Sequence, residues 1–481
     1  MPSIRRSFAL SFAQRYSALA IQLGAVVVLA RLLTPAEFGT FAVASAVVTL
    51  ATVLQDFGVG NYLVQERTLD RGKLETAYCI AFVIAWPLGI GLYAASDAIA
   101  AWYGEPTLAP VIAILSLSFF AMPFGTPPIA MMRRDLQFGR LYALGVAGAA
   151  ATAAISLALA LNGGGAISLA CGFVAGSLVS AAGAHLLRPG MLLLRPGLRH
   201  WRAVLSFGGQ SSAIAALTEL GNQVPSIAAG RMLGIEAAGL LHRATSTIQI
   251  YRKSVLDGIM PVLLPAFAAK LRLGHALKES YLRGVAYLTA VGWPFSVVLA
   301  LLAHPVLRVL FGPQWDAAVP LVQILCIAGA LTPFVHLGRP LFIALGRIDL
   351  SLRIQLVVQP LKLGLVILAA FHGLVWVAAA LCLPPLLNAW LAHRHLARLL
   401  GYSAGDLLAA VARSAGVTLA SAAAPLLVVL TLGAQPEHSL LALALGGGGA
   451  ALGWLAGVIA CGHPARSELT MAAARLFPRF A

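Results

Sequence analysis

One short stretch of the chain carries charged and polar side chains inside a long apolar region. In "HRATSTIQIYRKSV", residues 242–255, polar residues recur at i, i+3, i+4, i+7, i+10 and i+11. At 100° per residue these positions share one face of an α-helix. The members of this polar face are His242, Thr245, Ser246, Gln249, Arg252 and Lys253, with Arg243 at its edge. Cationic and amide side chains on one face suit the binding of an anion such as phosphate.

The composition places this stretch in a membrane protein. Of the 481 residues, 60% are hydrophobic and only 10% are charged, with a mean hydropathy of +0.88. A soluble domain carries about 25% charged residues, and no soluble core would hide so much apolar surface. The net charge of +16 does not indicate a nucleic-acid partner, because the basic residues lie between apolar runs without interleaved aromatic residues.

Apolar windows of about 20 residues predict roughly fourteen transmembrane helices. They lie near residues 13–33, 38–63, 77–102, 108–132, 141–161, 165–187, 206–230, 235–264, 284–310, 319–345, 352–371, 373–392, 409–431 and 440–461. We therefore predict an all-α polytopic membrane protein.

The loops between the spans predict its orientation. With the N-terminus inside, Lys and Arg gather in alternate loops, whereas "TPAEF", "YGEPT", "NGGG", "GPQWD" and "GAQPEH" contain none. This positive-inside pattern predicts that both termini are cytoplasmic. The start "MPSIRRSFALSFAQRY" fits an uncleaved basic segment, because no small-residue cleavage site follows it.

An internal repeat relates the two halves of the chain. "RLLTPAEFG" from Arg31 matches "RMLGIEAAG" from Arg231 at an offset of 200 residues, and "PVIAIL" from Pro110 matches "PLVQIL" from Pro320. Two parallel six-helix repeats predict two lobes with a binding site between them. The predicted organisation is an N-terminal lobe over 1–190, a C-terminal lobe over 200–400, two additional transmembrane helices over 405–465 and a cytoplasmic tail over 466–481.

The repeat offers a comparison for the polar face. Its equivalent residues in the first half are Ala42, Ser45, Ala46, Thr49, Thr52 and Val53, all uncharged. The architecture alone therefore does not require the cations, and a charge at the bilayer centre costs about 2.5–3.5 kcal/mol on insertion scales. Two explanations stay open: Arg252 and Lys253 snorkel to the cytoplasm and form a salt bridge, or they line a cavity that holds an anion.

Other polar residues lie inside apolar spans. Arg339 and Lys362 are further candidates for the cationic cavity. In "SFGGQSSAIAALTELGNQVPSIAAG", from Ser206, the candidates for hydrogen bonds to sugar hydroxyls are Gln210, Asn222 and Gln223. Hydrogen bonds between helices are the alternative for each of these amides.

Four segments in order resemble a known family. "ARLLTPAEFGTFAVASAVVTLATVLQDFGVGNYLVQ", "MMRRDLQFGRL", "IAAGRMLGIEAAGLLHRA" and "LFGPQWDAAVPLVQILCIAGAL" are similar to the polysaccharide transporter, or oligosaccharide flippase (Wzx-type), family. That family belongs to the multidrug/oligosaccharidyl-lipid/polysaccharide (MOP) exporter superfamily, and the resemblance runs to about residue 400.

The resemblance implies a V-shaped pair of helical bundles that works by alternating access. It implies a flippase that moves an undecaprenyl-pyrophosphate-linked oligosaccharide across the bacterial inner membrane for lipopolysaccharide, capsule or exopolysaccharide biosynthesis. The partners would be the membrane, the lipid-linked oligosaccharide, and a polymerase and glycosyltransferases of the same pathway. The carboxylates that we would test for coupling to an ion are Asp56, Glu219 and Asp257.

Three alternatives remain at this point. A peptidoglycan lipid-precursor flippase has similar chemistry and a similar number of spans. A multidrug exporter for cations would favour acidic residues in its cavity, whereas the charges within these spans are mainly basic. A membrane polysaccharide polymerase, the distant alternative, would have a large outer loop, whereas every outer loop here is short.

The chain shows no pattern that indicates a cofactor, a metal or catalysis. Its five cysteines stand singly in apolar sequence, without CxxC or Cys/His spacing. No phosphate-binding Gly loop or Ser/His/Asp arrangement appears. We therefore expect a non-enzymatic protein without a resident cofactor.

Overall fold

The computed structural model describes residues 17–467, except 18–19, 57–58, 67, 192–196, 257–266, 268–269, 272–276 and 434–435. By its internal contacts the chain divides into two compact units, Met1–His242 and Arg243–Ala481. The contacts group α9 (Trp201–Met232) with the first unit because it packs along α2 (Pro35–Asp56). The boundary near residue 200 that the repeat predicts for the second lobe stays a prediction.

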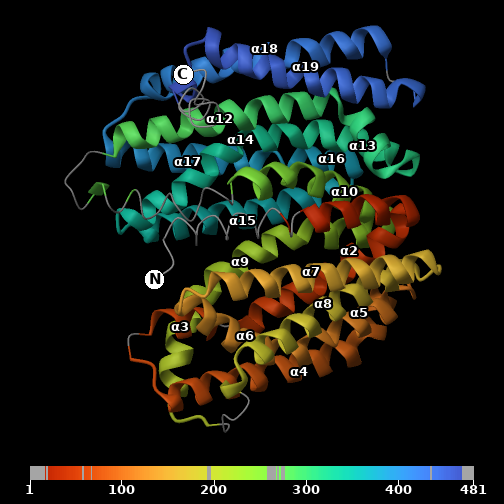
Figure 1. Ribbon diagram of the computed structural model, residues 1–481, viewed down its shortest axis with the longest axis vertical. Helices are drawn as coiled ribbons and strands as arrows, with labels where there is room; N and C mark the ends of the chain where they lie inside the picture. Colours follow the sequence, from red (N-terminus) through yellow and green to blue (C-terminus); the bar gives the residue numbers. More distant parts are fainter. Residues whose placement is uncertain are drawn as a thin grey trace, which may run out of the picture. The chain divides into compact units, whose positions relative to one another are not determined.

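All regular structure in the described residues is helical (Figure 1). The first unit contains a helix over Ala20–Leu32, then α2, α3 (Val59–Gln65), α4 (Arg71–Tyr103), α5 (Leu108–Ser116), α6 (Ser118–Arg134), α7 (Phe138–Leu161), α8 (Gly165–Leu187) and α9. Helix α10 (Ile235–Tyr251) passes from the first unit into the second. The second unit continues with the π-helix η2 (Arg252–Leu256), α12 (Lys278–Leu301), α13 (Ala303–Phe311), the 3₁₀-helix η3 (Pro313–Ala318), α14 (Val319–Ala344), α15 (Ile348–Ala370), α16 (Leu374–Ala380), α17 (Leu383–Leu400), α18 (Ala404–Leu432) and α19 (Ser439–Ala460).

The helices confirm the predicted class of all-α polytopic membrane protein. Within the described residues, eleven helical segments are long and apolar enough to cross a membrane. The predicted spans at 13–33, 206–230 and 235–264 correspond to Ala20–Leu32, α9 and α10, which are not among the eleven. Each of the roughly fourteen predicted spans therefore overlaps a helix.

Proline positions explain two interruptions within the predicted spans. Pro305 lies in the first turn of α13, directly after the break at Leu302, and Pro384 lies in the first turn of α17, after the break at Cys382. A proline is tolerated in a first helical turn, where its missing N–H needs no partner, but it ends the preceding helix. The spans predicted at 284–310 and 373–392 are therefore pairs of shorter helices.

In the first unit, α7 and α8 run side by side (Figure 1). Small residues permit this close approach. A Cβ on Gly172 would overlap the Oγ of Ser156, and one on Gly176 would overlap the Oγ1 of Thr152. Helix α6 packs on the same pair through α8. Close packing through Gly, Ser and Thr is the usual way in which membrane helices associate.

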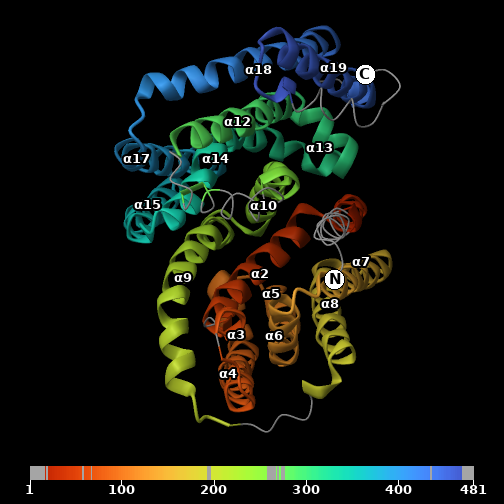
Figure 2. The same cartoon turned by 60° about the vertical axis from the view of Figure 1, so that its left-hand side comes forward.

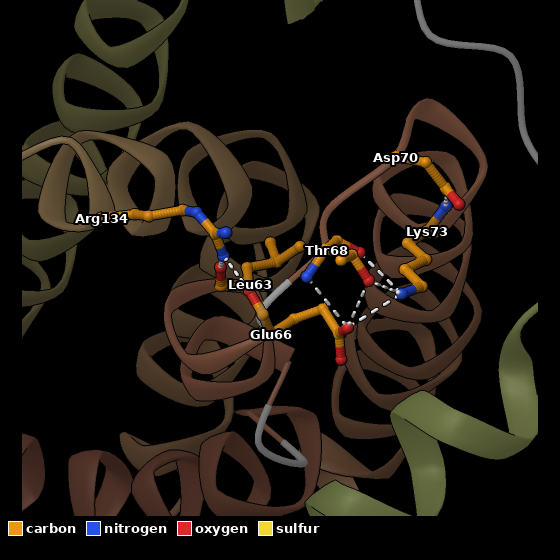
Figure 3. A network of polar contacts seen from close by, with 6 residues as sticks. All are labelled: Leu63, Glu66, Thr68, Asp70, Lys73 and Arg134. Atoms are coloured by element: carbon orange, nitrogen blue, oxygen red, sulfur yellow. Dashed lines mark hydrogen bonds and ion pairs between the residues drawn. The ribbon is translucent and has the colours of Figure 1, made fainter.

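A polar network holds three loop ends of the first unit together (Figure 3). The Arg134 guanidinium donates to the carbonyl oxygens of Leu63 and Glu66, at 2.9 and 2.5 Å. Lys73 Nζ donates to a Glu66 carboxylate oxygen at 2.8 Å and holds the pKa of that carboxyl below its ordinary value. An ion pair also joins Arg188 to Asp135. Three of the basic loops thus lie at one end of the unit, as the predicted alternation of loops requires.

In the second unit, the additional helices α18 and α19 pack together and dock on α12 (Figure 2). Trp454 Nε1 donates to the carbonyl oxygen of Ala290 at 2.7 Å. Thr289 Oγ1 donates to Ser414 Oγ at 2.9 Å, and Ser414 Oγ lies 3.2 Å from Nε2 of the buried His463. The two helices without a repeat partner are therefore an integral part of the second unit.

Candidate functional site

Helix α10 has the two faces that its sequence pattern predicted. Leu240, Ala244 and Tyr251 of the apolar face are buried. On the polar face Gln249 and Lys253 are exposed, and its remaining members are partly exposed: His242, Thr245, Ser246 and Arg252. No member of the polar face is packed into the core.

The α-helix changes to a π-helix at Arg252, the first of the two adjacent cations of the polar face. After Tyr251 the chain continues as one turn of π-helix over Arg252–Leu256, a local widening that is frequent at functional sites. Tyr251 anchors this junction: its hydroxyl donates to the carbonyl oxygen of Leu288 at 3.0 Å, and its ring stacks on Phe295 with centroids 5.4 Å apart. Gly292 makes room for the hydroxyl, since a Cβ there would lie 2.7 Å from it.

A small cavity of about 60 Å³ opens beside this junction. It is lined by Ile248, Gln249, Tyr251, Arg252, Phe295, Ser296, Gly329 and Thr332. Its volume suits one or two water molecules or a single small polar group. Arg252 Nη2 donates to Gln249 Oε1 at 3.1 Å, so the amide orients a guanidinium that carries five N–H donors. Arginine in such a setting suits phosphate oxygens.

The equivalent face in the first unit has different chemistry. On α2, Ser45 Oγ donates to the carbonyl oxygen of Ala42 at 3.0 Å, and Thr52 Oγ1 donates to that of Thr49 at 2.7 Å. These hydroxyls are bonded to their own helix, and Ala42 is buried. The cations of the polar face of α10 thus have no counterpart at the equivalent positions of α2.

Arg243 lies away from this cavity. Its side chain is buried between two aromatic rings, with the guanidinium carbon 4.5 Å from the centroid of Phe311 and 4.6 Å from that of Trp315. A desolvated arginine over aromatic rings contributes about 2 kcal/mol. We interpret Arg243 as the residue that fastens α10 to α13 and η3, and we do not include it among the proposed ligands of an anion.

The other two predicted cations lie on neighbouring helices. Arg339 is exposed on α14, and Lys362 is half-buried on α15. Neither lines the cavity beside Arg252. A role for them in binding the substrate stays a prediction from the sequence.

A second polar cluster lies on α9. Gln223 Nε2 donates to Glu219 Oε1 at 2.5 Å, and Asn222 Nδ2 donates to Glu219 Oε2 at 3.4 Å. The three residues stand at i, i+3 and i+4, so they share one face of the helix. The structure therefore brings a predicted coupling carboxylate together with two of the predicted sugar-binding amides.

The remaining predicted residues fall outside the described part of the chain. The side chains of Gln210 in α9 and Asp56 in α2 are not described, and Asp257 is masked entirely. Among the described residues, no three His, Cys, Asp or Glu side chains gather where they could hold a metal ion.

Six of the eight residues that line the cavity were not identified from the sequence, among them Phe295, Ser296 and Thr332. Ser296 and Thr332 are single hydroxyls in apolar spans, and Phe295 carries no polar group. Hydroxyl residues in membrane helices usually bond their own backbone, as Thr332 does with Ala328 at 3.3 Å. Only their contact with α10 distinguishes them, and no pattern in the sequence indicates that contact.

Many apolar helices, an internal repeat and one cation-bearing helix face define a polytopic helical membrane protein of the transporter type. Residues 28–320 match the sequence profile of a family described as polysaccharide biosynthesis protein. The chain belongs to this family, which confirms the resemblance that its motifs had indicated.

Curated relatives carry transport and polysaccharide names. The chain is 26% identical over 332 residues to the lipopolysaccharide biosynthesis protein WzxC of Escherichia coli (strain K12), covering 68% of this chain and 67% of the relative. It is 28% identical over 311 residues to the succinoglycan biosynthesis transport protein ExoT of Rhizobium meliloti (strain 1021), covering 64% and 63%. The chain thus spans about two thirds of the length of these relatives.

Solved structures show the same fold at low identity. The lipid II flippase MurJ in an inward closed conformation superposes with a TM-score of 0.76 at 12% identity, covering 92% of this chain and 97% of that one. A multidrug resistance MATE family transporter of the MOP superfamily, inward-facing, gives a TM-score of 0.56 at 15% identity, covering 84% and 97%. The chain therefore shares the fold of these two solved proteins.

Proposed function

We propose that this protein is a flippase of the bacterial inner membrane that moves an undecaprenyl-pyrophosphate-linked oligosaccharide towards the periplasm. The polymer would be lipopolysaccharide, capsule or exopolysaccharide. The observation that carries the proposal is the cationic junction of α10, where Arg252 lines a small cavity beside a π-helical turn. Family membership supports a role in polysaccharide biosynthesis, and the name of ExoT, a succinoglycan biosynthesis transport protein, supports the transport of such material.

In this proposal Arg252 and Lys253 hold the pyrophosphate. Arginine offers a fork of donors to phosphate oxygens, whereas lysine adds a mobile point charge. Gln249 fixes the guanidinium through its 3.1 Å hydrogen bond, and Ser296 brings a buried hydroxyl to the cavity. The lipid tail would stay in the bilayer while the charged head crosses between the repeats.

The two repeats provide the movement. Parallel repeats permit a site to be exposed to each side of the membrane in turn as one bundle rocks against the other. The membrane potential, negative inside, drives an anion outwards by about 2.3 kcal/mol per charge per 100 mV. We also propose Glu219 as the carboxylate that couples this movement to a cation, because its two oxygens accept hydrogen bonds from neighbouring amide side chains of α9.

The rival functions within the superfamily differ in the substrate. A multidrug exporter for cations would have carboxylates where Arg252 and Lys253 stand. A peptidoglycan-precursor flippase would also bind a pyrophosphate, and the likeness to MurJ at 12% identity concerns the fold alone. Family membership favours the polysaccharide substrate over both.

The test is export by a double variant. Arg252→Ala/Lys253→Ala should lower surface polysaccharide at least about tenfold, since each charge-assisted hydrogen bond contributes about 1.5–3 kcal/mol. Membrane levels of the protein, measured by immunoblot, should stay normal. Arg398→Ala removes an exposed cation of α17 in the same unit and should export normally. Normal export by the double variant would refute the proposed site.

A further inference from the structure

A second and larger cavity, of about 420 Å³, lies wholly within the first unit. Helices α6, α7 and α8 form it, together with the helix Ala20–Leu32. Its polar lining residues are Gln22, Thr126, Thr152, Ser177 and Ser180. Pockets that hold small organic molecules measure about 300–1,000 Å³, so this one is large enough for a ligand.

Close packing of α7 against α8 explains the glycines between these two helices, but it does not explain why the cavity beside them is left open. Gly176 and Gly148 bring α7 and α8 together, since a Cβ on Gly148 would lie 2.5 Å from Ser180 Oγ. On α6, Gly125 also faces the cavity, and a Cβ there would meet only ordinary contacts at 3.6 Å or more. The space between α6 and the α7–α8 pair is therefore left open where a larger side chain at Gly125 would fill it.

The hydroxyl groups of the lining present their oxygen lone pairs. Thr126 Oγ1 donates to the carbonyl oxygen of Met122 at 3.1 Å, and Thr152 Oγ1 donates to that of Gly148 at 3.0 Å. Ser177 Oγ likewise donates to the carbonyl oxygen of Phe173 at 3.1 Å. Each hydroxyl has used its single proton within its own helix, and its lone pairs remain as acceptors. A ligand suited to this lining therefore brings its own O–H donors.

The absence of charged residues from the lining of this cavity limits the kinds of ligand that it could bind. None of the residues that line this cavity carries a charge, so neither a pyrophosphate nor a cationic drug finds a counter-ion there. Its remaining wall is apolar, with Met122, Ile129 and Phe173 among its residues. A neutral ring with hydroxyl donors at its edge and C–H groups on its faces matches both kinds of surface.

We propose that this cavity binds a sugar ring of the transported lipid-linked oligosaccharide. The inference rests on the proposed function and deepens it, because it names the part of the transported molecule that this neutral, hydroxyl-lined cavity would hold.

Variants that remove only the acceptors test this inference. Thr126→Val, Thr152→Val and Ser177→Ala, combined, keep the shape of the lining nearly unchanged but delete three of its four hydroxyls. The matched control is Thr431→Val, which removes a hydroxyl that donates to the carbonyl oxygen of Leu427 at 2.8 Å on α18, far along the chain from the cavity. Thermal unfolding of each purified variant establishes that it is folded.

Binding is measured in lipid nanodiscs with two probes: undecaprenyl diphosphate, and undecaprenyl diphosphate that carries one glucose. The triple variant should bind the glucose-bearing lipid about tenfold more weakly, the loss expected for two or three hydrogen bonds. Its affinity for the sugarless lipid should not change, and Thr431→Val should bind both probes like the wild type.

Each contrary outcome has a distinct meaning. If the triple variant loses affinity for both probes equally, the cavity holds the lipid chain or the phosphate, and the sugar assignment is overturned. If it loses affinity for neither, the cavity takes no part in binding and the assignment is again overturned, while the proposed function stands. If the wild type itself binds neither probe, the proposed function fails and the sugar site fails with it.

Discussion

Gly39 of α2 and Gly239 of α10 lie against each other's helices in a reciprocal contact. A Cβ on Gly39 would overlap the carbonyl oxygen of Ile235, and a Cβ on Gly239 would overlap that of Pro35. The two glycines stand 200 residues apart, which is the offset of the internal repeat. The repeat-related helices therefore cross at equivalent points with their backbones in direct contact, an arrangement that only glycine permits.

The crossing predicts that even a methyl group is harmful there. Gly39→Ala or Gly239→Ala must push the two backbones apart, and overpacking of this kind costs about 1–3 kcal/mol. We expect a lower midpoint of thermal unfolding for either variant in detergent. Gly91→Ala is the control, because a Cβ at that position in α4 has no neighbour within 4 Å. A midpoint equal to that of Gly91→Ala would contradict the reciprocal contact.

We expect substitutions of Arg243 and Arg252 to have opposite effects on stability and transport, although the two residues lie on the same segment. Arg243→Ala removes a buried guanidinium between Phe311 and Trp315 and should lower the unfolding midpoint, by an amount corresponding to about 2 kcal/mol or more. Transport per folded molecule should remain. Arg252→Ala should leave the midpoint nearly unchanged but reduce transport.

The two arginine variants are compared by measuring thermal unfolding and export on the same preparations. A stable Arg243→Ala protein that exports nothing would show that Arg243 does bind the substrate, against our interpretation. The comparison thus separates an arginine that holds the fold from one that holds a ligand.

The docking of α18 and α19 should depend on pH through His463. Burial lowers the pKa of His463 below its ordinary value of 6.5, so the folded protein favours the neutral ring. As the pH falls, His463 of the unfolded chain binds a proton at a higher pH than His463 of the folded protein. The folded state therefore loses stability from about pH 6.5 downwards, until the pH passes the lowered pKa of the folded protein. Ser414, Tyr287 and Arg413 surround the ring, and Arg413 adds to the cost of protonation.

We expect the thermal unfolding midpoint of the wild type to decrease as the pH is lowered from about 7.5 to about 5. His463→Gln keeps a partner for Ser414 but does not titrate, so its midpoint should depend less on pH over this range. Equal slopes for both proteins would assign the pH dependence to other groups.

The sequence was a good guide to the helices because their signal is local. Apolar windows and the alternation of basic loops depend on composition over about 20 residues, and each predicted span overlaps a helix. The repeat motif likewise contained both glycines of the α2–α10 crossing. The two faces of α10 followed from its spacing of 100° per residue.

The site was less predictable because its contacts are distant in the chain. The sequence around Arg243 does not predict that Phe311 and Trp315 will enclose its side chain. Helical spacing alone therefore placed Arg243 at the edge of the polar face. The π-helical turn at Arg252 changes the angular spacing that the helical pattern assumed. The hydroxyl-lined cavity depends on three helices whose small residues are individually typical of membrane packing.

Glu219 offers the sharpest test of how transport is driven. Its two carboxylate oxygens accept from Gln223 and Asn222, and a glutamine at this position has only one oxygen and cannot exchange a proton or balance a cation. If Glu219 couples the movement to an ion, Glu219→Gln should retain wild-type affinity for undecaprenyl diphosphate. It should nevertheless lose the acceleration of flipping that an imposed proton or sodium gradient produces in proteoliposomes.

The control for Glu219 is Asn222→Ala, which removes the longer of the two hydrogen bonds but keeps the charge. It should remain responsive to the gradient, because the carboxylate and its 2.5 Å bond to Gln223 are intact. If Glu219→Gln responds to the gradient as the wild type does, the carboxylate serves only to join neighbouring polar side chains of α9. Transport would then draw on the membrane potential alone, which already favours outward movement of an anionic head group.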